Sequence, residues 1–365
     1  MLLGRDRERQ QIDQALARAQ VGMSATLVLA GEPGIGKTVL LGYAAEHAGR
    51  MRLLRARGVE SEAQIPFGSL LELLRPALEM LDNIPQPQAA ALEGALALRP
   101  GTAHDRFAVG AATLSLLAAY AEQAPVAVLV DDAQWLDGES LRALHGLTRD
   151  LSGVPVLLLL AVTPQPAREE LDQLRAQLGR DIPGTAVTLE PLGPAELRAL
   201  SRWAMPGYTD VEVDRLARRL AADSAGLPLL AVELLHAVAL GLDLHHTAHA
   251  WPEPQRTLDQ TLPGDLPEAI VAAVRIGFRR LSKNAQLALS AAAVLGGRAA
   301  AQQLARATEL AESALHDALD ELEWQRWLAA DGRGYSFVAR LAGQIVERDM
   351  ITPGQKSRFL ERLGS

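Results

Sequence analysis

Eight residues near the start of the chain decide its fold: Gly31-Glu32-Pro33-Gly34-Ile35-Gly36-Lys37-Thr38. They fit the pattern G-x-x-x-x-G-K-[ST], and they follow an apolar run at 25–30 that has the composition of a buried strand. A glycine-rich turn between a strand and a helix can point backbone N–H groups inward, and the helix dipole adds positive potential. The sequence therefore predicts that this loop binds the phosphates of a nucleotide.

Two side chains of the loop have specific predicted roles. Lys37 is expected to reach the β- and γ-phosphates, and the hydroxyl of Thr38 to ligate Mg²⁺. The other six residues of the pattern are expected to surround the phosphates: Gly31, Glu32, Pro33, Gly34, Ile35 and Gly36. A chance glycine turn is the alternative, but the chain has only three lysines among its 36 basic residues, and one stands where the pattern requires it.

A second apolar strand, predicted at 126–130, ends in the carboxylates of Asp131 and Asp132. In a parallel sheet such a strand end lies at the carboxyl edge, where ligands bind. Asp131 is predicted to hold Mg²⁺, directly or through water, as the acidic residue of a Walker B strand does, and Asp132 to orient or deprotonate the attacking water. The alternative is that both carboxylates cap the helix beginning near Ser140 or are solvated in a loop.

Phosphoryl transfer also calls for a cation on the γ-phosphate, because negative charge spreads over its oxygens in the transition state. Arg149, at the end of the helix after the Walker B strand, is the first candidate. Arg168, just past the strand at 156–162, is the weaker one. Each is equally compatible with a solvated surface arginine.

The spacing of apolar residues predicts the organisation of the chain. Strands at 25–30, 126–130 and 156–162 alternate with helices, which indicates an α/β core over 1–190 with a parallel sheet covered on both faces. The helices of that core are expected at 7–18, 38–47, 70–81, 106–122 and 140–151.

Beyond this core the pattern becomes helical. Apolar residues recur at helical spacing at 195–205, 211–222 and 228–240, which predicts a helical lid subdomain over 191–242. A linker is expected at 243–265. Its histidines, His245, His246 and His249, are interpreted as solvated residues rather than metal ligands, because no carboxylate or cysteine partner accompanies them.

The last hundred residues predict a winged-helix-like domain over 266–365. Helices at 269–281, 284–295, 299–305 and 315–323 precede a short hairpin with a glycine turn. From residue 266 onward 13 Lys and Arg face 11 Asp and Glu, so the domain carries no strongly basic stripe and DNA contact is not favoured.

Composition narrows the function classes further. Cysteine is absent, which excludes disulfides, thiolate zinc sites and thiol catalysis, and the net charge of −8 argues against a globally basic nucleic-acid binder. The first residues are charged and lack the apolar core of a signal peptide, and the longest apolar run, at 154–162, is too short to span a bilayer. We therefore expect a cytoplasmic protein without membrane partners.

Several segments together resemble a known family: 3–8, the glycine loop 31–38, 66–70, 105–107, the run Val130-Asp131-Asp132-Ala133-Gln134-Trp135-Leu136-Asp137, and 226–230. The chain resembles the signal-transduction ATPases with numerous domains, the STAND class of AAA+-related P-loop ATPases. Within that class it is similar to the ATPase portion of large LuxR-type and MalT-like bacterial transcriptional regulators. The resemblance covers nearly the whole chain.

The resemblance implies a switch that ADP holds closed and that ATP and an inducer open, permitting self-association. It implies adenine nucleotide as ligand and an unidentified regulatory protein or inducer as partner. It also implies that Arg5 and Pro228 lie near the adenine or ribose, Pro228 within a Gly-x-Pro motif of the lid.

One position departs from the family pattern. Relatives often end the strand corresponding to 156–162 with an arginine that senses the γ-phosphate, whereas this chain has Thr163 and Pro164 there. We therefore expect a Mg²⁺-dependent ATP-binding switch with slow ATPase activity. Two alternatives stay open: a DNA-associated AAA+ ATPase of the origin-recognition or loader type, and a nucleotide-binding adaptor without significant turnover.

Overall fold

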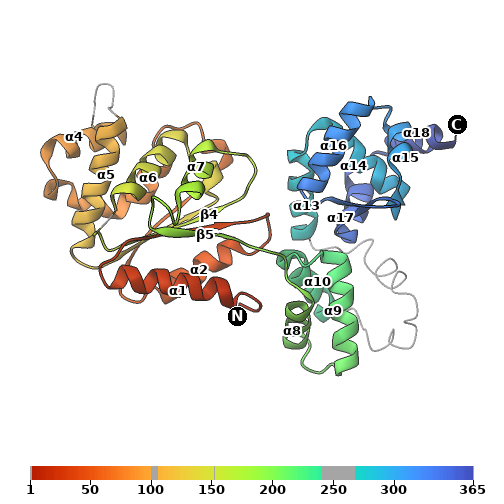
Figure 1. Cartoon of the computed structure of the whole chain (residues 1–365), viewed down its shortest axis with the longest axis horizontal. Coiled ribbons are helices and arrows are strands. Elements are labelled where there is room, and N and C mark those ends of the chain that lie inside the picture. The colour runs from red at the N-terminus through yellow and green to blue at the C-terminus, as the bar shows by residue number, and fades with distance from the viewer. Residues whose placement is uncertain (1, 100–105, 152, 241–267, 365) are drawn as a thin grey trace. The chain divides into compact units, whose positions relative to one another are not determined.

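The computed structural model describes residues 2–99, 106–151, 153–240 and 268–364 (Figure 1). The chain divides into two compact units, residues 1–190 and 191–365. The expected linker at 243–265, with His245, His246 and His249, lies outside the described residues.

The first unit is built on a five-stranded parallel sheet of order β2-β3-β4-β1-β5. Its interior strands are β1 (Ala25–Ala30), β3 (Val126–Asp131) and β4 (Val156–Val162), and β2 (Arg52–Arg57) and β5 (Gly184–Thr188) form the edges. Every residue of β1 and β4 is buried, which explains their continuous apolar sequence. The predicted α/β core with a parallel sheet is confirmed.

Helices cover both faces of this sheet (Figure 1). One face carries α1 (Asp6–Gln20) and α2 (Lys37–His47), and the other carries α5 (Arg106–Ala121), α6 (Gly138–Asp150) and α7 (Glu169–Gln177). Each Leu or Val side chain fully buried between these layers contributes about 1.5–3 kcal/mol relative to an exposed one.

The segment between β2 and α5 differs from the sequence prediction. It contains η1 (Glu60–Glu62), α3 (Gly68–Leu74), η2 (Arg75–Asn83) and α4 (Gln86–Ala95). The single helix predicted at 70–81 is therefore wrong. The α-helix ends at Leu74 and continues as a 3-10 helix, because Pro76 has no N–H with which to continue the α-helical hydrogen bonds.

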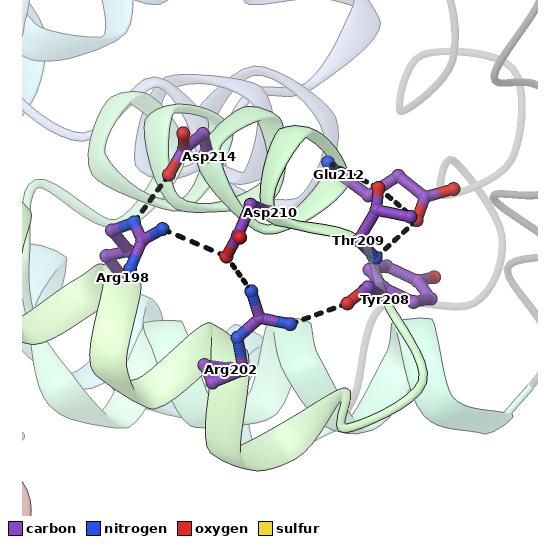
Figure 2. A network of polar contacts seen from close by, with 7 residues as sticks. All are labelled: Arg198, Arg202, Tyr208, Thr209, Asp210, Glu212 and Asp214. Atoms are coloured by element: carbon purple, nitrogen blue, oxygen red, sulfur yellow. Dashed lines mark hydrogen bonds and ion pairs between the residues drawn. The ribbon is translucent and has the colours of Figure 1, made fainter.

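The second unit begins with three helices, α8 (Pro194–Ala204), α9 (Asp210–Ser224) and α10 (Pro228–Leu240). A polar network fixes the turn between the first two (Figure 2). In it Arg198 donates to Asp214 across 2.6 Å and to Asp210 across 3.2 Å.

The same network closes the end of the turn that leads into α9. Arg202 also pairs with Asp210 and donates to the carbonyl oxygen of Tyr208 across 2.6 Å. Thr209 and Glu212 then form a capping box that begins α9 (Figure 2). The turn is therefore held by side chains of both helices that it joins.

The rest of the unit contains α13 (Glu268–Arg280), α14 (Lys283–Leu295), α15 (Ala301–Thr308) and α16 (Glu312–Trp324). Three short strands, β6 (Arg298–Ala299), β7 (Leu328–Asp331) and β8 (Gly334–Phe337), form an antiparallel sheet of order β6-β8-β7. The chain continues through α17 (Arg340–Ile345), a π-helical turn η4 (Val346–Met350) and α18 (Pro353–Gly364).

A buried carboxylate joins the first and last parts of this unit. Asp223 of α9 accepts from Arg219 across 2.5 Å and from Nη2 of Arg340, on α17, across 2.7 Å. Its side chain is 5% exposed, so the two arginines compensate a carboxylate that has lost nearly all of its hydration.

None of the helices within the described ranges combines the length and apolar character needed to cross a bilayer.

Candidate nucleotide site

The glycine loop joins β1 to α2 at the carboxyl edge of the sheet. Gly34 and Gly36 have φ angles of 80° and 102°, in the left-handed region that favours glycine. The N–H of Gly31 donates to the carbonyl oxygen of Val162, the last residue of β4, across 3.1 Å. The loop is thus anchored to the neighbouring strand end, and α2 begins at Lys37 directly after it.

The ammonium group of Lys37 lies over this loop. Its Nζ donates to the carbonyl oxygens of Gly31 and Glu32 across 2.8 and 2.9 Å, and the residue is 6% exposed. A phosphate oxygen is a stronger acceptor for an ammonium than a neutral carbonyl. The lysine is therefore placed where it can exchange loop carbonyls for phosphate oxygens.

The structure brings the loop and the acidic strand end together. The hydroxyl of Thr38 donates to Oδ2 of Asp131 across 2.8 Å, although β4 lies between their strands. Helix α6 is capped by a different residue, since the carboxylate of Asp137 accepts from the backbone N–H of Ser140. Helix capping by Asp131 and Asp132 is therefore wrong as an alternative.

Asp132 is oriented by three neighbours. Its backbone N–H donates to Oδ1 of Asp131 across 3.0 Å, and its φ of 48° turns the chain sharply at the end of the strand. Its Oδ1 accepts from Nε2 of Gln134 across 3.1 Å, and its Oδ2 lies 3.4 Å from Nη2 of Arg57. Arg57, the last residue of β2, was not among the predicted site residues, because this edge strand was itself not predicted.

A close backbone approach holds the ends of β2 and β3 together. The N–H of Gly58 donates to the carbonyl oxygen of Asp131 across 2.9 Å. A Cβ atom on Gly58 would lie 2.2 Å from the carbonyl oxygen of Asp132, so no other residue fits there without moving the acidic strand end.

Asp137, the last residue of the acidic run, connects the segment after β3 to residues 67–69. Asp137 is 1% exposed and accepts from the backbone N–H groups of Phe67 and Ser69 across 2.9 and 3.1 Å. It also accepts from the N–H and hydroxyl of Ser140 across 2.9 and 2.7 Å. Two segments that carried the family resemblance, 66–70 and 130–137, are thus tied together through one carboxylate.

Arg5 lies against the glycine loop. The residue is 6% exposed, and its Nη2 donates to the carbonyl oxygen of Ile35 across 3.1 Å while Nη1 pairs with Glu8. This hydrogen bond attaches Arg5 to the glycine loop at Ile35. Its predicted contact with the adenine or ribose stays a prediction.

The other predicted cations are placed differently. Arg149 lies in the last turn of α6 and donates to Gln177, and α6 runs back from the carboxyl edge, so the structure does not bring Arg149 to the loop. Arg168 donates to the carbonyl oxygens of Gln134 and Leu136 across 3.2 and 3.0 Å and so braces the segment that follows Asp132. Pro228 begins α10 in the second unit, and its contact with the nucleotide also stays a prediction.

The donor set fits a magnesium ion bound together with phosphates. Among the described residues no group of three or more His, Asp or Glu could hold a metal on its own. Magnesium is usually held by one or two protein oxygens together with phosphates and water, and Thr38 and Asp131 supply a hydroxyl and a carboxylate within 2.8 Å of each other. When bound, the ion would neutralise charge on the β- and γ-phosphate oxygens.

A parallel sheet covered on both faces, with a glycine loop and an acidic strand end meeting at its carboxyl edge, fits the α/β core of a P-loop NTPase. Residues 1–160 match the family described as AAA ATPase domain. A search of curated proteins finds no match.

Several solved structures are similar to this chain at low sequence identity, and the first of them shares its fold. The Walker-type ATPase PABY2304 of Pyrococcus abyssi is similar with a TM-score of 0.58 and 15% identity, over 94% of this chain and 96% of that chain. The STAND protein PH0952 of Pyrococcus horikoshii, which has a tetratricopeptide repeat sensor, gives a TM-score of 0.39 and 16% identity over 100% of this chain and 45% of that one. Cdc6p of Pyrobaculum aerophilum gives a TM-score of 0.47 and 17% identity, over 99% of this chain and 95% of that chain.

Proposed function

We propose that the chain is a Mg²⁺-dependent ATP-binding switch of the STAND type that hydrolyses ATP slowly. The observation that carries this proposal is the 2.8 Å hydrogen bond between Thr38 and Asp131. It joins a hydroxyl of the glycine loop to a carboxylate of the acidic strand end, the pair of oxygens that a nucleotide-bound magnesium needs.

Each group in this site has a proposed role. Lys37 and the backbone N–H groups of 31–38 bind the phosphates, Thr38 and Asp131 hold the ion, and Asp132 positions the attacking water. Arg5 and Pro228 are proposed near the adenine or ribose by family resemblance alone. Slow turnover is proposed because Thr163 and Pro164 follow β4, so no arginine stands at that strand end.

We also propose the division into a core at 1–190, a helical lid at 191–242, a linker at 243–265 and a winged-helix-like domain at 266–365. The sequence of elements α14, β6, α15, α16, β7 and β8, with sheet order β6-β8-β7, supports the last part. This succession of three helices and a small sheet with a hairpin is the arrangement expected of a winged helix.

DNA binding by the winged-helix-like domain is the second candidate function, and the acidic charge of α16 argues against it. The helix directly before the hairpin, α16, carries the acidic side chains Glu312, Asp317, Asp320, Glu321 and Glu323 and has no Lys or Arg. DNA-binding helices approach a polyanion and depend on basic contacts. We therefore favour a role in regulated assembly, and a salt-dependent gel shift with duplex DNA would reverse that preference.

Equilibrium binding of fluorescent ADP and ATP with Mg²⁺ tests the proposal. We expect Lys37→Ala to lose at least about 100-fold in affinity, because a desolvated ammonium–phosphate contact is removed. Lys283→Ala, at an exposed lysine that begins α14, is the matched control and should bind like the wild type. Equal binding by Lys37→Ala and the wild type would refute the site.

Size measurements by light scattering test the switch itself. We expect a larger species with a non-hydrolysable ATP analogue than with ADP, and no such difference for Lys37→Ala. An identical size in both nucleotides would leave a nucleotide-binding adaptor as the better interpretation.

A further inference from the structure

A buried glutamine connects the proposed water-positioning carboxylate to the end of β4. Gln134 lies in the short helical turn η3 (Ala133–Trp135) and is 1% exposed. Its Oε1 accepts from the N–H of Thr163 across 2.9 Å, and its Nε2 donates to Oδ1 of Asp132 across 3.1 Å. The N–H of Thr163 can only donate, so it fixes the orientation of the amide and directs the NH₂ group at Asp132.

This glutamine completes a continuous set of hydrogen bonds from the glycine loop to Asp132. The N–H of Gly31 donates to Val162, the peptide bond leads to Thr163, and Gln134 connects Thr163 to Asp132. The position after β4 contributes its backbone N–H to this set, although its side chain is not a cation.

We infer that Gln134 is a positioning residue for ATP hydrolysis. Its amide fixes the orientation of the Asp132 carboxylate relative to the glycine loop. This inference rests on the proposed function, since it assigns a role relative to the water that Asp132 positions. A reacting group that is held rigidly loses less entropy in the transition state, which is why fixing a carboxylate accelerates the step.

Gln134 and Arg57, whose side chains contact the carboxylate of Asp132, differ in how far they are buried. The charged residues that contact Asp132 in the described part of the chain are Asp131 on β3 and Arg57 on β2, and Arg168 donates to the backbone of Gln134. The side chain of Arg57 is 71% exposed, so solvent and salt weaken its ion pair with Asp132. Gln134 is almost fully shielded from water, so its contact persists in conditions that weaken the arginine pair.

The substitution Gln134→Glu tests the inference with little change of shape. A glutamate keeps an oxygen for the N–H of Thr163 but places a second oxygen where the NH₂ group faced Asp132. We expect kcat for ATP hydrolysis to fall roughly 10- to 100-fold. KM and the affinity for ATP should stay within about twofold, because the phosphate and metal groups are untouched.

Two controls separate positioning from folding. Gln173→Glu makes the same chemical change at an exposed glutamine of α7 that donates to Glu169 across 2.9 Å, and it should leave kcat unchanged. Hydrogen exchange at the amide of Thr163 should stay slow in Gln134→Glu, since its acceptor remains. Fast exchange there together with a reduced affinity for ATP would assign Gln134 a structural role and overturn the inference.

A double-mutant cycle shows whether Gln134 acts through Asp132. Single-turnover hydrolysis of labelled ATP is measured for Asp132→Asn with and without Gln134→Glu. We expect the second substitution to change the rate by less than about twofold in this background, because the carboxylate it positions is gone. If Gln134→Glu lowers the hydrolysis rate by the same factor in Asp132→Asn as in the wild type, the result would contradict the inference.

The failure of this inference differs from the failure of the proposed function. A Gln134→Glu variant with the kcat of the wild type overturns the inference while the switch stands. A wild type that releases phosphate no faster than Asp132→Asn overturns hydrolysis by this site, and the role of Gln134 with it.

Discussion

The hydroxyl of Thr38 and the carboxylate of Asp131 are hydrogen-bonded across 2.8 Å, although 93 residues separate them in the chain. The sheet order explains this meeting, since β1 and β3 are both neighbours of β4 and end at the same edge. The two oxygens therefore lie side by side without an ion, and a bound Mg²⁺ would take the place of the hydrogen bond between them while the hydroxyl of Thr38 keeps its proton.

This arrangement predicts a specific loss of metal dependence. In the wild type we expect ATP to bind more tightly with Mg²⁺ than with EDTA. In Asp131→Asn the ratio of the ATP affinity with Mg²⁺ to the affinity with EDTA should fall roughly tenfold or more, because an amide oxygen is a weaker magnesium ligand than a carboxylate. Titration calorimetry in both buffers measures it.

The matched control for the metal experiment is Asp181→Asn, at an exposed aspartate after α7. It should retain the full difference between the two buffers. An Asp131→Asn variant that behaves like this control would show that Asp131 is not a magnesium ligand.

The ion pair between Arg57 and Asp132 predicts a faster variant. A carboxylate engaged by a guanidinium is a poorer acceptor for the proton of water, so Arg57→Ala should raise the rate of ATP hydrolysis. The pair is exposed and contributes about 0.2–1 kcal/mol, so we expect an increase of about 1.5- to 5-fold. Steady-state phosphate release at low and high salt checks it, and the gain should shrink at high salt.

Arg55→Ala is the companion variant for that experiment. Arg55 is exposed on the same face of β2, two residues from Arg57, and should leave the rate unchanged. If Arg57→Ala slows hydrolysis instead, Arg57 assists the reaction rather than restraining Asp132.

The four hydrogen bonds accepted by Asp137 predict a large effect on stability. Asp137→Ala removes a helix cap and leaves the buried N–H groups of Phe67 and Ser140 without their acceptor. We expect the free energy of unfolding of the first unit to fall by about 3 kcal/mol. Urea unfolding followed by hydrogen exchange of peptides from 1–190 measures it.

Asp172→Ala, at an aspartate whose side chain is 65% exposed in the first turn of α7, serves as reference for Asp137→Ala. Its effect should stay within about 0.5 kcal/mol. Equal stability of the two variants would mean that the hydrogen bonds of Asp137 contribute nothing net.

Gly226 predicts an effect in the second unit. Its φ is 76°, and a Cβ atom would lie 2.3 Å from the carbonyl oxygen of Leu192, a backbone atom that cannot move aside. Gly226→Ala should therefore cost at least about 2 kcal/mol of unfolding free energy in that unit. Gly207→Ala, with no atom within 4 Å of the added carbon, should cost less than about 0.5 kcal/mol. Thermal unfolding of both variants compares the two sites.

The strands that could be predicted from the sequence are those buried on both sides. β1, β3 and β4 are almost uniformly apolar, whereas the edge strands β2 and β5 alternate or are largely exposed, as in Arg52-Leu53-Leu54-Arg55-Ala56-Arg57. Their arginines and small residues do not distinguish a strand from a loop. Missing β2 also meant missing Arg57 as a neighbour of Asp132.

The positions of the glycine loop and the acidic strand end could be predicted because each has a local pattern. The contacts of Asp137 and Gln134 could not be predicted, because their partners come from 66–70 and from the end of β4, and such contacts leave no periodic pattern in the sequence. Arg149 was predicted from its helix alone, and the direction of α6 carries it away from the carboxyl edge.

The two ends of the run from Asp131 to Asp137 have different partners in the structure. Asp131, at its start, is hydrogen-bonded to the glycine loop, whereas Asp137, at its end, accepts from backbone N–H groups of a distant segment. A related chain that bound no nucleotide would still need an aspartate at the position of Asp137 to hold these two segments together. Finding it in another chain would thus be poor evidence of activity.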